Sequence, residues 1–219
     1  MSKKTSMFLG LAIAAAITTG TIKPESTEFE KVHKSKSEIT RVVEVKNVNK
    51  EIVKNAEEYL GMQYVFGGRD TEQLPGIDCL GVLFKSIEKV TGESWKKWSV
   101  TPSKLLKQFD STKEKTFYNE DIKDKKFITD NFKEGDVLMF LLPYKNDKDI
   151  PVRKMDLKDD NGKVVANLDL WVWHVAIYSG KGNIIHASSF DENYSVLEEN
   201  LFDFVKRNEL SGVIKTNLK

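Results

Sequence analysis

Cys79 is the only cysteine of the 219-residue chain, and it lies where the loop residues 76–78 give way to a helical pattern. Two of the three histidines, His174 and His186, come much later, in neighbouring strand-like segments joined by the turn 179–182. A cysteine nucleophile needs a base within hydrogen-bond reach and a third group that orients the base. The three residues therefore predict thiol catalysis, with Cys79 as nucleophile, His174 as base and His186 as the orienting residue.

The surroundings of Cys79 predict an activated thiol. Asp78 is a suitable N-cap, so Cys79 falls in the first turn of a helix, where the helix dipole favours negative charge. Such a position lowers a thiol pKa from ~8.5 toward ~3.5–7.5. It also directs backbone N–H groups toward an oxyanion. We therefore expect a lowered pKa for Cys79.

Whether His174 and His186 can contact each other depends on the register of the two strands. If the hairpin pairs around residue 180, His174 lies opposite His186 and both side chains share one face. A slip by one residue would send His186 to the other face.

Other interpretations of these residues remain open. A single cysteine in a helix is often a small buried apolar side chain, and a strand histidine is often structural. One cysteine, two histidines and a carboxylate lack the closely spaced ligand pairs of a zinc site, so we expect no metal. His33, in a polar segment, is expected to be solvated. The four tryptophans are expected to pack structurally and are not assigned to the site (Trp95, Trp98, Trp171 and Trp173).

Composition indicates one soluble globular domain. Apolar residues make up 40% and charged residues 31%, with 34 basic against 33 acidic side chains and a net charge of +1. This balance gives no general attraction to nucleic acid, which we do not expect as a partner. One cysteine cannot form an intramolecular disulfide, and we expect a monomer.

The N-terminus predicts export. Lys3 and Lys4 precede the apolar run 7–17, which is followed by small residues and is shorter than the ~20 residues that a membrane-spanning helix prefers. We interpret residues 1–22 as a signal peptide or, alternatively, an uncleaved N-terminal membrane anchor. Residues 23–45 are predicted to be a polar linker, and residues 46–219 the domain. The expected location is periplasmic, cell-wall-associated or secreted.

The order of elements predicts an α+β fold. Helical spacing runs from about residue 47 to Gly61 and from Cys79 to Gly92, and residues 93–134 are expected to be further helix and loop. Strands are predicted at 137–142, 171–178 and 183–188. The insert at about 143–170 carries a strong turn signal at 159–162 and is expected to form an exposed hairpin that could cover the groove. Helices followed by strands favour an antiparallel sheet.

Five segments together resemble the NlpC family of papain-like cell-wall peptidases. They run in the family's order and cover most of the chain from about Val53 to Ile214: Ala56-x-x-Tyr59-Leu60-Gly61-x-x-Tyr64-Val65-Phe66-Gly67-Gly68, Gly76-Ile77-Asp78-Cys79-x-Gly81, Gly135-Asp136-Val137, His174-Val175-Ala176-Ile177-Tyr178-x-Gly180 and Ile185-His186-Ala187. The resemblance implies a papain-like NlpC-type domain in which the nucleophile lies at a helix N-terminus packed on an antiparallel sheet.

The resemblance also implies a reaction. Cys79, His174 and His186 match the family's catalytic positions, and Tyr64 and Asp78 match positions that bind the free amine of a peptidoglycan stem peptide. The implied activity is a γ-D-glutamyl-type endopeptidase that forms a thioester and needs no cofactor. Leu80 stands where the family usually has a serine that contributes to binding of the substrate amine, and Gln63 stands where proline is common.

Two other functions remain open at this point. The first is an amidase or acyl-transfer enzyme that acts on another amide or on a lipid. The second is a non-catalytic cell-wall-binding protein that retains the fold.

Overall fold

A computed structural model describes residues 48–97, 101–143, 150–189 and 194–218. The predicted signal peptide or anchor (1–22), the predicted linker (23–45) and His33 lie outside the described residues, as does Trp98.

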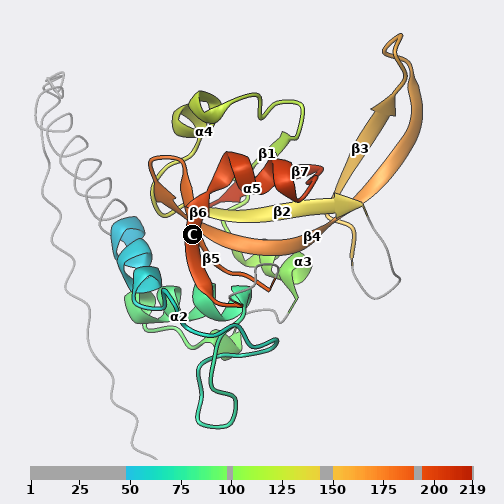
Figure 1. Cartoon of the computed structure of the whole chain (residues 1–219). Helices are drawn as coiled ribbons and strands as arrows, with labels where there is room; N and C mark the ends of the chain where they lie inside the picture. The colour runs from blue at the N-terminus through green and yellow to red at the C-terminus, as the bar shows by residue number, and fades with distance from the viewer. Residues whose placement is uncertain (1–47, 98–100, 144–149, 190–193, 219) are drawn as a thin grey trace, which may run out of the picture. The chain divides into compact units, whose positions relative to one another are not determined.

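The described residues form an α+β fold (Figure 1). Residues 48–57 are helical. The elements that follow are α2 (Cys79–Thr91), η1 (Trp95–Lys97), α3 (Pro102–Leu105), η2 (Leu106–Gln108), β1 (Lys115–Tyr118), α4 (Lys125–Asn131), β2 (Val137–Pro143), β3 (Arg153–Lys158), β4 (Val164–Gly180), β5 (Asn183–Ala187), β6 (Val196–Asn200), α5 (Leu201–Arg207) and β7 (Gly212–Thr216).

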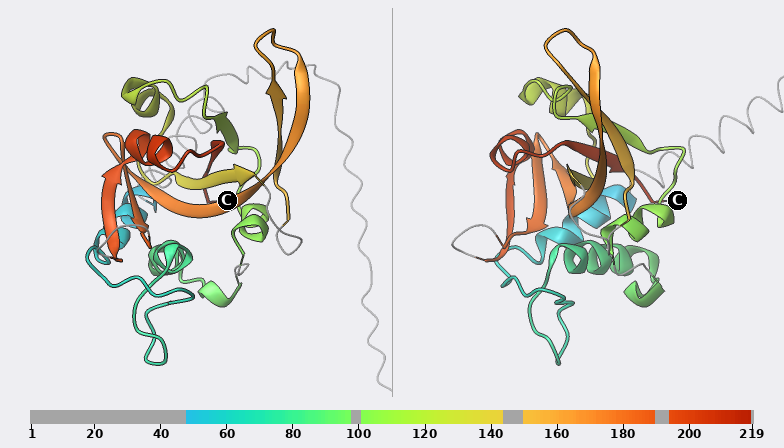
Figure 2. Two further views of the ribbon diagram at one scale, coloured as in Figure 1. Left: turned by 45° about the vertical axis from the view of Figure 1, so that its right-hand side comes forward. Right: turned by 90° about the vertical axis from the view of Figure 1, so that its right-hand side faces the viewer.

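The seven strands form one antiparallel sheet in the order β1-β7-β2-β4-β5-β6, with β3 paired to β4. Helices cover both faces of this sheet: α2 lies on one side, and α4 and α5 lie on the other (Figures 1 and 2). Each side has its own buried apolar cluster. Val82, Leu83 and Ile87 of α2 contribute to the first, and Phe204 of α5 with Tyr178 of β4 to the second.

Local sequence accounts for α2. The Asp78 side chain accepts a hydrogen bond from the backbone N–H of Gly81 at 2.7 Å, which caps the helix start. Gly92 ends the helix with φ +69°, a left-handed conformation that glycine adopts without a Cβ clash. Both predicted ends of this helix are confirmed, and they fix Cys79 as its first residue.

The strand that carries His174 is longer than predicted. β4 runs for 17 residues, from Val164 to Gly180, and its outer half pairs with β3 to form the projecting hairpin seen at the upper right of Figure 1. The insert therefore forms a hairpin, as expected, but as an extension of the core strand rather than as a separate unit. The short strand β1, with Phe117 as its one buried residue, lies in a segment expected to be helix and loop.

Candidate active site

Cys79 lies in a pocket of about 670 Å³ between the start of α2 and strand β4. The thiol residue is partly exposed, and the backbone of Val175 on β4 hydrogen-bonds to the sulfur. Four of the five predicted site residues line this pocket, and His186 does not. The described lining residues are Tyr64, Phe66, Gly67, Arg69, Asp78, Cys79, Leu80, Thr101, Pro102, Trp171, Trp173, His174 and Ser189.

A bulge in β4 shapes the wall opposite Cys79. Phe140 of β2 pairs with His174, but the next residue, Leu141, pairs with Val172, so Trp173 is the extra residue of the ladder. Bulges redirect side chains and are common beside active sites. Here Trp173 and its neighbour His174 both line the pocket.

His174 and His186 are in direct contact. The distance from His174 Nε2 to His186 Nδ1 is 2.8 Å, and the rings meet edge-to-face at 86°. Both are buried, His174 at 5% exposure and His186 at 0%. The predicted contact is present, although the ladder pairs Ile177 with Ile185, two residues away from the register we expected. An offset of two residues keeps a side chain on the same face, and so His186 still reaches His174.

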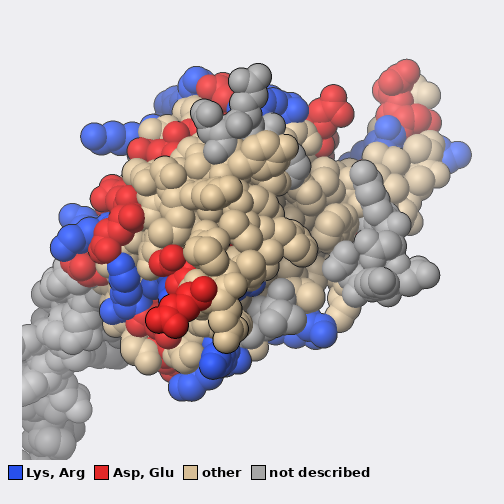
Figure 3. Space-filling model, turned by 60° about the horizontal axis from the view of Figure 1, so that its bottom comes forward, with Lys and Arg blue, Asp and Glu red and all other residues tan. Residues whose placement is uncertain are grey.

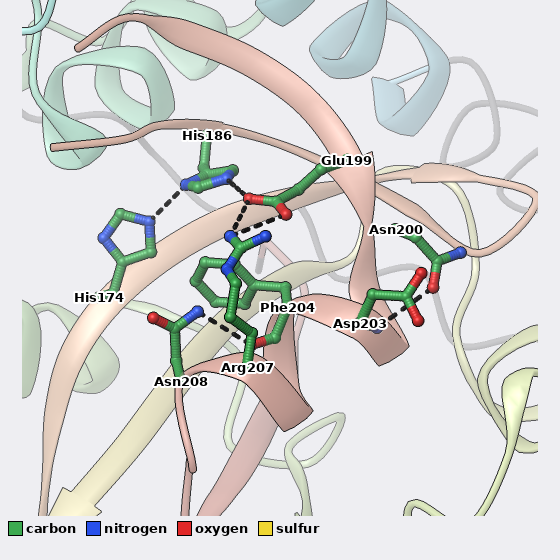
Figure 4. A network of polar contacts seen from close by, with 8 residues as sticks. All are labelled: His174, His186, Glu199, Asn200, Asp203, Phe204, Arg207 and Asn208. Carbon is green, nitrogen blue, oxygen red and sulfur yellow. Dashed lines mark hydrogen bonds and ion pairs between the residues drawn. The ribbon is translucent and has the colours of Figure 1, made fainter. Parts of the chain in front are cut away.

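Two further residues continue this chain of contacts (Figure 4). Glu199 Oε1 on β6 lies 2.8 Å from His186 Nε2, and Glu199 Oε2 forms an ion pair of 2.9 Å with Arg207 on α5. Glu199 faces His186 because β6 pairs with β5 so that Glu199 lies opposite Ile184, on the face that His186 shares. Sequence analysis missed both residues, since the β5–β6 register brings Glu199 to His186 and the position of α5 brings Arg207 to Glu199.

The contacts of Glu199 determine which ring nitrogens carry protons. A carboxylate paired with Arg207 only accepts hydrogen bonds, so His186 Nε2 carries the hydrogen of that contact. His186 Nδ1 then accepts from His174 Nε2–H. This tautomer leaves His174 Nδ1 with a free lone pair, as a general base requires.

The pKa values differ from the sequence-based expectation. Burial raises the pKa of the Cys79 thiol to about 12, and the Asp78 carboxylate adds to this rise, while backbone N–H groups of Val175 and Leu80 act against it. Burial, followed by the proximity of His186, lowers the pKa of His174 well below 6.5. The lowered thiol pKa predicted from the helix start is therefore wrong for this structure, because burial and Asp78 raise the pKa instead. Both directions favour the neutral thiol and the neutral imidazole in the resting enzyme.

Asp78 and Tyr64 line the pocket, as the resemblance implies, but Asp78 is already bound. Its carboxylate accepts from the backbone N–H of Gly67 at 3.0 Å and pairs with the guanidinium of Arg69. Burial raises the pKa of Tyr64, whose hydroxyl also bonds to the Ser189 side chain.

Two tryptophans belong to the pocket, contrary to expectation. Trp171 and Trp173 both line it, and Trp173 packs at a ring distance of 5.4 Å from His174. The pattern of alternation on a strand could not reveal this, because the bulge breaks that alternation.

No cluster of three or more His, Cys, Asp or Glu side chains suited to a metal ion occurs within the described ranges. Over the same part of the chain, no helix has the length and apolar character needed to cross a membrane.

Comparison with known proteins gives distant structural likenesses. No protein-family model matches the chain, and no curated protein matches it. Among similar solved structures, the NlpC/p60 domain of the peptidoglycan hydrolase SagA has 21% identity and a TM-score of 0.41, over 76% of this chain and 97% of that one. The peptidoglycan hydrolase RipB of Mycobacterium tuberculosis has 11% identity and a TM-score of 0.47, over 81% of this chain and 68% of that one.

A Staphylococcus aureus protein similar to a lipoprotein, of the NLP/P60 family, has 18% identity and a TM-score of 0.45. The match covers 78% of this chain and 41% of that one, so the chain spans less than half of the staphylococcal protein. These structures belong to the family that the motifs resemble. The chain's own elements confirm the expected α+β class, with Cys79 at a helix N-terminus packed on an antiparallel sheet.

Proposed function

We propose that this protein is a cysteine hydrolase in which Cys79 is the nucleophile, His174 the general base and His186 the residue that orients it. One observation carries the proposal: Cys79 and His174 line one pocket, and His174 is held from behind by His186. A structural cysteine or histidine would not need this arrangement.

The neutral resting pair favours proton transfer during attack rather than a preformed thiolate. As Cys79 Sγ bonds to the carbonyl carbon of the substrate amide, His174 Nδ1 takes the thiol proton. The backbone N–H groups near the sulfur are suited to stabilise the oxyanion that forms. The C–N bond then breaks, and His174 returns the proton to the leaving amine.

The acyl group is left as a thioester on Cys79. In the second half of the reaction, His174 takes a proton from water as the water oxygen attacks the thioester carbon. The carboxylic acid leaves, and the proton returns to the sulfur.

The substrate class we propose is the stem peptide of peptidoglycan, cut at an amide next to D-glutamate. The five motifs of the sequence support this class. Two of the similar structures are named as peptidoglycan hydrolases. Such a substrate lies outside the cytoplasm, which agrees with the export signal that we predict for residues 1–22.

Digestion of purified peptidoglycan tests the proposal. The full chain is incubated with the wall, beside Cys79→Ala and His174→Ala variants, and soluble products are identified by mass spectrometry. We expect stem-peptide fragments with the wild type and a loss of at least about a hundredfold with either variant. Equal release by Cys79→Ala would exclude the thiol as nucleophile, and no release from several wall types would exclude peptidoglycan as the substrate.

A further inference from the structure

Among the described residues that line the Cys79 pocket, Arg69 and Asp78 carry the formal charges, and they bind each other. Their side chains are 11% and 9% exposed. Asp78 Oδ1 also accepts from the N–H of Gly81, and Oδ2 from the N–H of Gly67. The carboxylate therefore accepts hydrogen bonds from three donors. Two of them are backbone N–H groups, one in the first turn of α2 and one in the loop that precedes it.

Arg69 makes further contacts besides its ion pair with Asp78. Its guanidinium donates to the Gly68 carbonyl at 2.7 Å and lies over the rings of Phe84 and Trp95, at 5.5 and 5.8 Å from their centroids. Separating a buried ion pair is strongly unfavourable because it leaves an uncompensated charge. An ammonium group entering the pocket would meet a carboxylate whose charge is already balanced by Arg69 and which accepts three hydrogen bonds, so it would gain little from Asp78.

The remaining wall is suited to uncharged groups. Phe66 is 87% exposed at the pocket, and Pro102 and the largely buried Leu80 are the aliphatic lining residues. The Trp171 indole N–H already donates to the carbonyl of Pro143 at 2.9 Å, so its ring presents apolar surface with no polar demand on a ligand. The wall favours flat or apolar groups over ions.

We propose that this site takes a peptide whose amine is acylated, and not one that ends in a free ammonium group beside Cys79. The inference rests on the proposed function and specifies its substrate: a stem peptide whose amine is still joined through an amide to its glycan. The acylated end lies against the aromatic wall of Phe66, Trp171 and Trp173.

Binding and turnover of two matched peptides test this inference. Both have the sequence of a stem peptide, and they differ only in an N-acetyl group on the first residue. Calorimetric titration of the full-length Cys79→Ala variant measures binding without reaction, and the wild type measures cleavage. We expect the acetylated peptide to bind the variant at least about tenfold more tightly. Equal affinities, or tighter binding of the free amine, would overturn the inference.

The two readouts separate this inference from the proposed function. If the variant prefers the acetylated peptide but the wild type cleaves neither, the pocket preference stands and the hydrolase proposal fails. If neither peptide binds, the stem-peptide substrate is wrong and the inference falls with it.

A surface variant tests the aromatic wall. Because Phe66 is 87% exposed, Phe66→Ala removes the ring with little effect on folding. We expect about three- to tenfold weaker binding of the acetylated peptide. Val165→Ala, at a position 61% exposed on the projecting hairpin, is the matched control and should bind normally. Equal affinity of Phe66→Ala and Val165→Ala would show that the ring does not contact the substrate.

Discussion

The orientation of His174 depends on contacts that reach beyond the predicted catalytic residues to Glu199 and Arg207. Glu199 sets the tautomer of His186 and, through it, that of His174. It also supplies a negative charge that stabilises a proton on the histidine pair while the thiol reacts. Its contribution is to position the base, since it does not line the pocket.

Glu199→Gln tests this role. The amide is nearly the same size but carries no charge, so the proton that His174 takes up is less stabilised. We expect kcat to fall by about tenfold or more with little change in KM.

The pH profile gives a second readout of the same change. His174 must be neutral to accept the thiol proton, and its pKa lies below 6.5, so the acid limb of the wild-type kcat/KM profile should fall below pH 6.5. Loss of the Glu199 charge lowers the proton affinity of the pair, which moves this limb to still lower pH. Glu198→Gln is the control, because Glu198 contacts Ser179 at 2.6 Å outside the network. Identical profiles for the two variants would remove Glu199 from the mechanism.

Among the site residues, the sequence was sufficient to predict those that are marked by their residue type and their immediate neighbours. Cys79 is unique in the chain and follows a capping residue, and the two histidines lie on one short hairpin. Glu199, Trp171 and Trp173 could not be found in the same way, because strand register and a bulge decide which face they occupy. Arg207 could not be found either, because it reaches Glu199 from helix α5.

At the scale of secondary structure, the helix at residues 48–57 meets the sheet at Gly135, just before β2 begins. Gly135 has φ +83°, and a Cβ at this position would lie 2.5 Å from Asn49 Cβ and 2.7 Å from the Asn49 carbonyl oxygen. The helical residues 48–57 therefore pack directly on the glycine. Only a residue without a side chain satisfies both the backbone angle and the contact.

Gly135→Ala should therefore destabilise the fold by about 3 kcal/mol, from the left-handed conformation and the overlap together. Gly162→Ala separates the two causes. Gly162 has φ +78°, but a Cβ added there would meet nothing within 4 Å, so its cost is the backbone term alone, about 1 kcal/mol. Urea unfolding of both variants measures the difference. Equal free energies of unfolding would show that the helix does not press on Gly135.

The same contrast between local and distant causes explains which elements were predicted. α2 has an N-cap and a glycine C-cap, and the β4–β5 hairpin has a glycine-containing turn, so nearby residues define them. β1 and β7 lie far apart in sequence and depend on distant pairing, since β7 pairs with both β1 and β2 and β1 pairs with β7. Their patterns alone are too short to distinguish strand from loop.

For the domain as a whole, the distribution of charge on the surface agrees with the nearly equal numbers of basic and acidic residues in the sequence. On the face drawn in Figure 3, basic and acidic side chains of the described residues lie interspersed at the margins of a broad uncharged area. This mixture, with a net charge of +1, offers no extended basic surface on that face for a polyanion. In the Cys79 pocket the charges of Arg69 and Asp78 offset each other, which is in keeping with a neutral ligand.

The projecting hairpin is the one large extension of the sheet within the described residues, and sequence analysis suggested that it could cover the groove. Residues 153–169 do not line the Cys79 pocket. The base of the hairpin is tied to the domain, since the Tyr118 hydroxyl donates to the Lys154 carbonyl at 2.9 Å and Met155 and Leu168 pack against the core. Residues 156–167 are all exposed.

Replacing residues 156–167 by Asn-Gly, a two-residue turn that suits a β-hairpin, should therefore leave the domain intact. The new turn joins Met155 to Leu168, which pair across the ladder, so the base of the hairpin is kept. We expect the free energy of unfolding to change by no more than about 1 kcal/mol, because the residues lost are exposed and pair only with one another. The kcat/KM for a soluble stem peptide should stay within about twofold of the wild type, since no group of the pocket is altered. A tenfold loss with an unchanged unfolding curve would instead mean that the hairpin reaches the substrate and that the site extends beyond the pocket around Cys79.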